Sequence, residues 1–297
     1  MSTTQLPEDP SALSKIGRLD FVAKQIVNGY MMGQHKSAYK GNSVEFVEHR
    51  QYTPGDEIKH IDWRAFGKTG RYYIKEFEEE TNLRCYLLMD ASGSMNYGQS
   101  TLTKFEYARY VVASLGYLLL RQRDAVGLQV FDTKLHDLIP ASVNPQQFQR
   151  LIHTLETLTP GGEASLGKLT RQFIRKIPRR CMVVLVSDAF DDIDQLTESL
   201  QMLRHAGHEV VLMQTLAPEE MDFPFTKPTK FESLEVEEPL LVDPLQLRAV
   251  YTEEFTAFQE QLNDATKRAG IDYLTFSTTD SIAQTLGAFI ASRSRRT

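Results

Sequence analysis

The chain has 297 residues, enough for one large domain or two modest ones with a core that needs no disulfide bonds. Hydrophobic residues make up 41% of it and charged residues 24%, which is the composition of an ordinary globular protein. The formal net charge of -6 argues against a general electrostatic affinity for nucleic acid, so we expect no nucleic-acid partner.

The N-terminal residues, the length of the apolar stretches and the cysteines indicate the cellular compartment of the protein. Glu8 and Asp9 stand where a signal peptide would have a basic start and an apolar core. The longest apolar stretch, residues 110–120, is too short to cross a bilayer. Cys85 and Cys181 each lie near the start of an apolar segment, where buried free thiols are expected in a reducing environment. We therefore expect a cytoplasmic protein without a membrane span.

The first third of the chain has two different periodicities. Residues 11–33 carry apolar side chains at helical spacing, which predicts an amphipathic opening helix. From Val44 the pattern becomes alternating, which predicts a small mixed subdomain whose second strand covers residues 71–77. The expected organisation is a helical segment over residues 1–40 followed by a subdomain over residues 41–82.

Strand-like and helix-like segments alternate along the rest of the chain. The predicted strands cover residues 84–90, 125–131, 134–139, 181–187, 209–214 and 271–276. The predicted helices cover residues 103–121, 145–157, 166–176, 193–205, 244–269 and 281–292, with a less regular excursion over residues 218–242. The strand at 134–139 follows a hairpin turn and should be an antiparallel edge. The expected fold class is α/β, with a doubly wound, mainly parallel sheet over residues 83–297.

The first predicted strand of this sheet ends in a group of oxygen ligands. Asp90 is followed by Ser92 and Ser94, and these side chains can converge where the chain turns at a strand end. A later apolar strand is followed by Asp188, so parallel pairing would place both aspartates at one sheet edge. Oxygen-only ligands suit Mg²⁺ or Mn²⁺. The alternative is that Asp90, Ser92 and Ser94 only cap the following helix.

These residues resemble a known kind of site. Asp90-x-Ser92-x-Ser94 with a later strand-end Asp188 is similar to the metal-ion-dependent adhesion site of von Willebrand factor A domains. Residues 41–80 resemble the signature of a bacterial family of that fold, the domain of unknown function family 58. The matching residues are Glu45, Arg50, Tyr52, Gly55, Asp56, Ile61, Asp62, Trp63, Arg64 and Lys68. Together the two resemblances imply a von Willebrand A-type domain with a cation at the carboxyl ends of its strands.

The chain departs from the family pattern at one ligand. Von Willebrand A domains usually supply a threonine from a loop between the two aspartates. Aligning this loop on its glycines and Leu166 puts Ala164 at that position, and alanine has no ligand atom. Ser165 could replace the threonine after a small shift, Glu163 could reach in, or water could fill the position. We therefore count Ser165 as the fifth candidate metal ligand.

Other kinds of site have weaker support. Residues 162–168 satisfy G-x4-G-K, but Leu169 stands where a Walker A loop needs Ser or Thr, and the segment follows a predicted helix instead of a strand. Ser92 occupies the place of the second aspartate of strand-end phosphotransferases. Neither Ser92 nor Ser165 lies in a G-x-S-x-G nucleophile elbow. We therefore expect neither nucleotide binding nor enzymatic activity.

The resemblance implies a metal-dependent protein-interaction module in which a carboxylate of the partner completes the coordination of the ion. Family members tend to be linked with MoxR-type AAA+ ATPases, so such an ATPase or its client is the implied partner, with this chain as adaptor or co-chaperone. The alternatives are a metal-dependent phosphoester hydrolase and a structural module without metal, which Ala164 favours. Trp63 with Arg64 should pack the subdomain onto the sheet or else face a partner.

Overall fold

The computed structural model describes residues 10, 17–36, 49–51, 63, 66–67, 70–75, 83–98, 102–163, 166–227, 229–231, 240–242 and 244–294. The chain forms two compact units, one of Met1–Gly33 with Leu83–Thr297 and the other of Gln34–Asn82. No helix among the described residues is long and apolar enough to cross a membrane.

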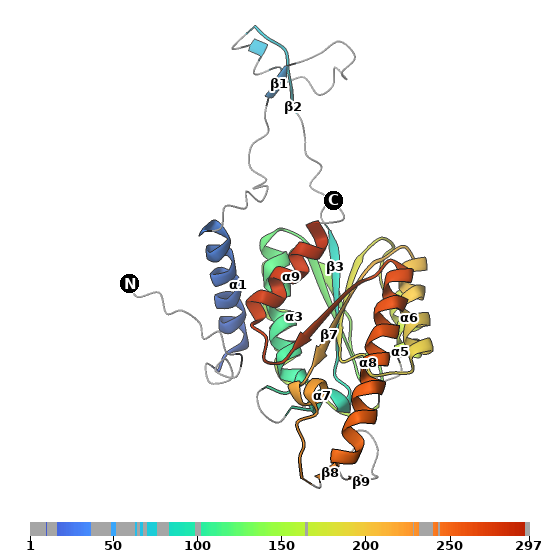
Figure 1. Cartoon of the computed structure of the whole chain (residues 1–297). Helices are drawn as coiled ribbons and strands as arrows, with labels where there is room; N and C mark the ends of the chain where they lie inside the picture. Colours follow the sequence, from blue (N-terminus) through green and yellow to red (C-terminus); the bar gives the residue numbers. More distant parts are fainter. Residues whose placement is uncertain are drawn as a thin grey trace. The chain divides into compact units, whose positions relative to one another are not determined.

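The larger unit is built around one sheet (Figure 1). Within the described residues, six strands pair in the order β10-β7-β6-β3-β4-β5. Their bounds are Arg84–Asp90 for β3, Ala125–Phe131 for β4, Ile139–Ser142 for β5, Met182–Ser187 for β6, Glu209–Leu216 for β7 and Asp272–Ser277 for β10. All neighbouring strands are parallel except β5, which is antiparallel to β4. The predicted doubly wound α/β fold class is confirmed.

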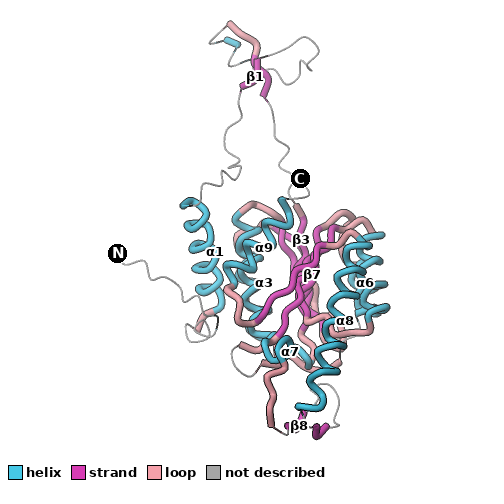
Figure 2. Tube along the Cα trace, in the orientation of Figure 1, coloured by secondary structure: helices cyan, strands magenta, loops and turns pink. Residues whose placement is uncertain are grey.

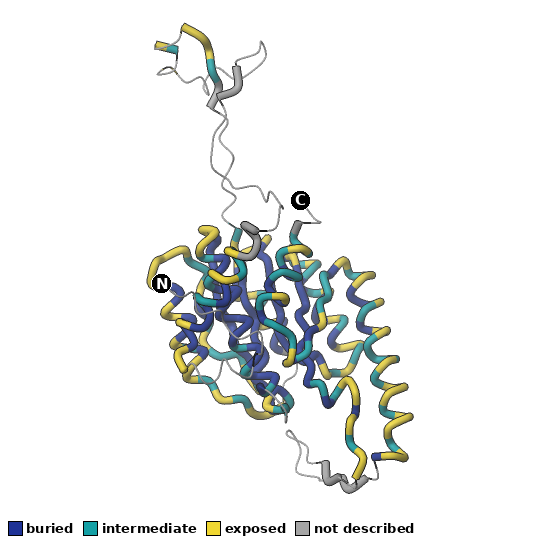
Figure 3. Tube along the Cα trace, turned by 60° about the vertical axis from the view of Figure 1, so that its left-hand side comes forward, coloured by how far each residue is buried: buried dark blue, intermediate teal, exposed yellow. Residues whose placement is uncertain are grey.

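Helices cover both faces of this sheet, as Figure 2 shows. The helices on one face are α1 (Leu19–Lys36), α3 (Lys104–Arg121), α4 (Gln147–Thr157) and α9 (Ile282–Ser294). The helices on the other face are α5 (Leu166–Ile174), α6 (Ile193–His205) and α8 (Pro244–Ala269). The inner strands β3, β4, β6 and β7 are buried along most of their length, and Figure 3 shows buried segments in dark blue in the middle of the unit with exposed segments in yellow around them.

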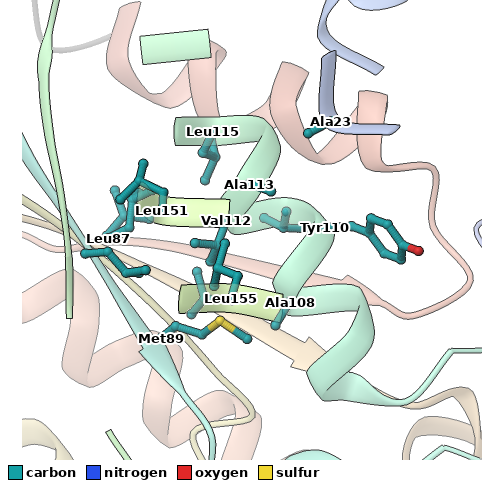
Figure 4. Packing of buried hydrophobic residues seen from close by; sticks show 14 of the residues in the cluster. Ala23, Leu87, Met89, Ala108, Tyr110, Val112, Ala113, Leu115, Leu151 and Leu155 are labelled. Carbon is teal, nitrogen blue, oxygen red and sulfur yellow. The ribbon is translucent and has the colours of Figure 1, made fainter. Parts of the chain in front are cut away.

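Alternation along the central strand produces the two core layers. Leu87 and Met89 of β3 belong to the core beneath α3, and Figure 4 shows them beside that helix. Tyr86 and Leu88 point to the opposite face and join the core beneath α5, α6 and α8. A strand that is buried on both faces needs a continuous apolar run, and β3 has one up to its last residue, Asp90. The carboxylate of Asp90 is thus delivered at the carboxyl end of the strand, directly after this run.

The edge strand begins later than the sequence predicts. The prediction placed it at residues 134–139, whereas β5 covers Ile139–Ser142. The turn before it is held by Asp132, whose carboxylate accepts a hydrogen bond from the backbone N–H of Lys134 and lies 2.6 Å from Nε2 of His136. These local bonds compete with the sheet ladder, so the residues between β4 and β5 form a turn with a single bridge from Phe131 to Leu135.

Three shorter pieces complete the description. The irregular excursion contains a short helix, α7 (Pro218–Asp222), and an antiparallel pair, β8 (Thr229–Phe231) with β9 (Leu240–Val242). In the smaller unit β1 (His49–Gln51) pairs antiparallel with β2 (Tyr73–Lys75). The same unit holds a stack of Phe66 on Tyr72, with Trp63 edge-on to Phe66. Arg64 and the other signature residues between 52 and 62 lie outside the described residues.

Candidate functional site

The two predicted aspartates lie at the carboxyl edge of neighbouring strands. Met89 pairs with Val186 in the parallel register of β3 and β6, so Asp90 and Ser187 come next and Asp188 follows at the same edge. Both residues are buried, with 3% and 2% of their surface exposed. Two buried carboxylates near each other are unfavourable unless donors or cations offset their charge.

Protein donors hold the carboxylate of Asp90 in place. The backbone N–H of Ser92 donates to Oδ1 at 2.8 Å, and the hydroxyl of Ser187 donates to Oδ2 at 2.5 Å. Ser187 in turn accepts a hydrogen bond from the N–H of Ala189. The sequence reasoning missed Ser187, although its position as the last residue of a strand that precedes Asp188 was a usable signal.

Burial, and after it the charge of Asp188, raises the pKa of Asp90 to about 7, against the lowering effect of the hydrogen bonds from Ser187 and Ser92. A carboxyl group with such a pKa is only partly ionised at neutral pH. A cation beside it would favour the ionised form, because an opposite charge lowers the pKa of a carboxyl group. A nearby cation would therefore stabilise the ionised form of Asp90, which burial and Asp188 disfavour.

The serine hydroxyls converge next to Asp90. A 3-10 turn, η3 (Gly93–Asn96), follows the strand, and Oγ of Ser92 lies 3.1 Å from Oγ of Ser94. Ser92 precedes the turn, but its side chain accepts no capping hydrogen bond, which is contrary to the alternative that it only caps a helix. Neighbouring ligands around an octahedral Mg²⁺ are about 3 Å apart, since the metal–oxygen distance is about 2.1 Å. The spacing of the two hydroxyls fits such an ion.

A glycine loop packs against the turn that carries the serines. Gly93 donates its N–H to the carbonyl of Gly162, and Gly161 donates to the carbonyl of Ala91. Gly162 has φ +76, and a Cβ there would meet Cγ2 of Thr133 at 2.4 Å, so a side chain at this position would force a shift. Ser165, the fifth predicted ligand, lies outside the described residues together with Ala164.

The structure also brings a lysine into this site. Nζ of Lys104, the first residue of α3, lies 2.7 Å from Oδ2 of Asp188 and 2.6 Å from Oε1 of Glu220. Its side chain is 1% exposed, and the rings of Tyr97 and Phe190 lie 5.8 Å and 5.1 Å away. Burial lowers the pKa of Lys104, but Asp188 and Glu220 outweigh that effect and the pKa is raised. Lys104 is therefore an ammonium ion with two carboxylate partners.

The position of Lys104 at the start of a predicted helix is a signal in the sequence that points to its unusual surroundings. Lysine in the first turn of a helix opposes the helix dipole, and it is usually found near the other end. Its burial requires an acidic partner, which Asp188 and Glu220 supply from distant parts of the chain. Glu220 is itself held in α7, because its Oε2 accepts the N–H of Ala217 and its carbonyl accepts the hydroxyl of Tyr251.

The oxygen atoms at this edge can bind a hard cation only if the serine hydroxyls act as ligands together with the carboxylates. No group of three or more His, Cys, Asp or Glu side chains is arranged to hold a metal among the residues that the structure describes. The side chain of Ser92 nevertheless hydrogen-bonds to the carboxylate of Asp90 and lies 3.1 Å from the hydroxyl of Ser94, and Asp188 adds a second carboxylate at the same edge. Oxygen-rich sites with few carboxylates and several waters are typical of Mg²⁺ and Mn²⁺.

The surroundings of residues 162–168, the segment that resembles a Walker A loop, argue against nucleotide binding. Residues 158–163 follow helix α4 and lead into α5, so no strand precedes the glycines. In a P-loop the phosphate-binding turn connects a strand to a helix. Gly161 and Gly162 instead support the turn that carries Ser92 and Ser94.

The chain is similar in sequence to a known protein family and to several bacterial proteins. Residues 48–261 match the model of the family described as "Protein of unknown function DUF58". An uncharacterized protein of Mycobacterium tuberculosis (strain ATCC 25618 / H37Rv) is 24% identical over 293 residues, which cover 97% of this chain and 92% of that protein. The uncharacterized protein YeaD of Bacillus subtilis (strain 168) is 24% identical over 151 residues, which cover 50% of this chain and 36% of that protein.

Solved structures with a similar fold have low sequence identity. The conserved hypothetical protein BatB from Bacteroides thetaiotaomicron aligns with a TM-score of 0.47 and 15% identity, covering 72% of this chain and 99% of that chain. The SpRpn10 VWA domain aligns with a TM-score of 0.43 and 14% identity, covering 69% of this chain and 93% of that chain.

Proposed function

The chain belongs to the family described as protein of unknown function DUF58, and we propose that it is a protein-interaction module whose carboxyl-edge site binds Mg²⁺ or Mn²⁺. The observation that carries this proposal is the convergence of Asp90, Ser92 and Ser94 beside Asp188. A von Willebrand A-like fold suits an interaction module, because its carboxyl edge presents loops on a rigid sheet.

In this proposal the ion is held by Asp90 and the hydroxyls of Ser92 and Ser94, with Asp188 beside it and Ser165 as a further ligand. When bound, the ion would offer an open coordination position to a carboxylate of a partner protein. The donors from Ser92 and Ser187 would orient the carboxylate of Asp90, and the ion itself would favour its ionised form. The Gly161–Gly162 loop would fix the turn that aims the two hydroxyls.

The proposed partner is a MoxR-type AAA+ ATPase or its client, with this chain as adaptor or co-chaperone. This partner is what the family resemblance of residues 41–80 implies, and the match of residues 48–261 supports the family itself. The chain would then be an accessory protein without enzymatic activity of its own. The expected cytoplasmic location fits such a role and also stays a prediction.

A structural module without metal is a second candidate, and one observation favours it. Each carboxylate oxygen of Asp90 and Asp188 already has a protein donor, because Phe190 donates its N–H to Oδ1 of Asp188 and Lys104 donates to Oδ2. The hydrolase alternative has less support. The described groups that contact these two carboxylates are N–H, hydroxyl and ammonium donors, which are poor candidates for a general base.

Titration calorimetry with Mn²⁺ tests the metal site. We expect the wild type to bind the ion and Asp90→Ala to lose binding, because the substitution removes the central ligand. Asp264→Ala, which removes an exposed carboxylate from α8, is the matched control and should bind like the wild type. Equal binding by all three proteins would sink the assignment and leave the structural module as the better account.

A pull-down of the tagged protein from its native lysate tests the partner. We expect the ATPase to be retained in Mg²⁺ and lost on adding EDTA or with Asp188→Ala, while circular dichroism shows the fold intact. Retention of the ATPase under both conditions would place the interaction elsewhere, with the signature residues around Trp63 as the next region to test.

A further inference from the structure

Lys104 occupies a place that its own helix does not favour. It is the residue directly after the N-cap Thr103, where the helix dipole repels a positive charge. Its side chain is almost completely buried, which is costly for an ammonium ion unless carboxylates pair with it. Something other than helix formation must therefore explain a lysine at this position.

The surroundings of the ammonium are those of a cation site. Asp188 and Glu220 provide carboxylate oxygens at 2.7 Å and 2.6 Å, and the rings of Tyr97 and Phe190 face it within cation–π range. The carboxylates come from the loop after β6 and from α7, so three separate elements meet at one positive charge. The ammonium of Lys104 therefore pairs with Asp188, the aspartate that lies beside Asp90 at the carboxyl edge of the sheet.

We propose that Lys104 is a tethered cation that competes with the divalent ion for Asp188 and so sets the affinity of the metal site. This inference rests on the proposed function. An ion bound by Asp90, Ser92 and Ser94 has two possible arrangements. Either Asp188 stays paired with Lys104, or Oδ2 of Asp188 binds the ion and its hydrogen bond with Lys104 is broken. In both cases the fixed positive charge repels the ion and makes the site weaker than the same ligands would be without the lysine.

The tethered charge has a second effect on the protein without an ion. Lys104 offsets the negative charge of Asp188 and Glu220, so the fold at this edge does not depend on a bound metal. A variant without the ammonium should therefore unfold more easily in EDTA and should gain more stability from added Mn²⁺ than the wild type gains. This readout does not involve any activity of the protein.

The experiment uses the full chain and Mn²⁺ as the probe, with free Mn²⁺ followed by electron paramagnetic resonance. Lys104→Met removes the charge and keeps an unbranched side chain that is one atom shorter. We expect the Kd for Mn²⁺ to fall about tenfold or more, the electrostatic effect of one unit charge a few ångströms from a divalent ion. Lys176→Met, which removes an exposed charge after α5, changes the net charge equally and should leave the Kd unchanged.

A pair of variants keeps the test decisive if Lys104→Met does not fold. Glu220→Gln and the double variant Lys104→Met/Glu220→Gln differ only by the ammonium. In the double variant the carboxylate of Glu220 is replaced by a neutral amide, so no buried charge at residue 220 loses its partner. The double variant should bind Mn²⁺ about tenfold more tightly than Glu220→Gln alone. Thermal unfolding in EDTA and in Mn²⁺ is measured on the same samples.

The outcomes separate this inference from the proposed function. If the wild type binds Mn²⁺ and removal of the ammonium leaves the Kd unchanged or raises it, the role of Lys104 is overturned and the metal site stands. If only the variants without the ammonium bind, the role of Lys104 is supported and the metal dependence of the wild type is rejected. If no variant binds, both are overturned.

Discussion

At the scale of single residues, the site depends on side chains that orient the candidate ligands. Ser187 links the two strands, because its hydroxyl donates to Asp90 and accepts from the backbone of Ala189. Both Ser187 and Asp90 are buried, so water cannot replace the lost donor easily. A buried acceptor without its partner costs more free energy than the hydrogen bond itself contributes.

Ser187→Ala should therefore lower the free energy of unfolding by about 1–3 kcal/mol, the cost of leaving a buried carboxylate oxygen without a donor. Urea unfolding in EDTA measures this effect without a contribution from metal binding. Ser142→Ala at the end of edge strand β5 is the control, because its hydroxyl makes an exposed hydrogen bond to the N–H of Asn144. Equal stability of the two variants would contradict the orienting role of Ser187.

At the scale of secondary structure, α3 places Lys104 by the way it begins. Thr103 and Glu106 form a capping box, in which Oγ1 of Thr103 accepts the N–H of Glu106 and the carboxylate of Glu106 accepts the N–H of Thr103. The backbone N–H of Lys104 donates to the carbonyl of Tyr97. These bonds fix the first turn of the helix and with it the start of the lysine side chain.

Thr103→Ala should cost about 1 kcal/mol of stability, because it removes the side-chain acceptor of the cap. Thr157→Ala at the last residue of α4 is a suitable control, since its hydroxyl only bonds back to carbonyls of its own helix. The difference in urea midpoint between the two variants measures the cap. A smaller loss for Thr103→Ala than for Thr157→Ala would show that the capping box does not determine this helix start.

Element boundaries were predictable where local pattern and burial agree. The predicted strand at 84–90 has the observed bounds, because its apolar run marks it in the sequence. The predicted helix at 193–205 also has the observed bounds, because Asp192 caps its first turn. The edge strand was misplaced, since an edge strand carries only a weak pattern and the side chain of Asp132 decided where the turn ends.

At the scale of the whole molecule, the first helix is part of the sheet-containing unit. Val22, Ala23 and Val27 of α1 are completely buried in the core that includes α3, and Arg121 of α3 donates a hydrogen bond to Asn28. The organisation expected from the sequence, with a helical segment over residues 1–40, stays a prediction. The structure assigns residues 1–33 to the same compact unit as residues 83–297.

Val27→Asp should therefore destabilise the sheet-containing unit by more than about 3 kcal/mol, because it buries an unpaired charge in the core. Phe21→Asp on the same helix is the matched control, since Phe21 is 48% exposed. Thermal unfolding followed by circular dichroism compares the two. If both variants unfold at the temperature of the wild type, α1 is not part of this folding unit and the boundary expected from the sequence holds.

The sequence by itself determined the features that short windows encode. Apolar runs and helical spacing gave the alternating strands and helices, and the position of Asp90 and Asp188 after such runs placed both at a strand end. The neighbouring Ser92 and Ser94 followed from their spacing, since a turn after a strand brings nearby residues together. These inferences need only local geometry, in which a period of 2 or 3.6 residues fixes the direction of each side chain.

Only the tertiary structure decided which distant side chains meet at this edge. Ser187 reaches Asp90 across 97 positions, and Lys104 reaches Asp188 across 84 and Glu220 across 116. Such contacts depend on the strand order and on the packing of α3 and α7 at the carboxyl ends, which no local pattern specifies. For the same reason the charge balance of the site, with a lysine among its acids, was not predictable, because burial and pairing are properties of the assembled fold.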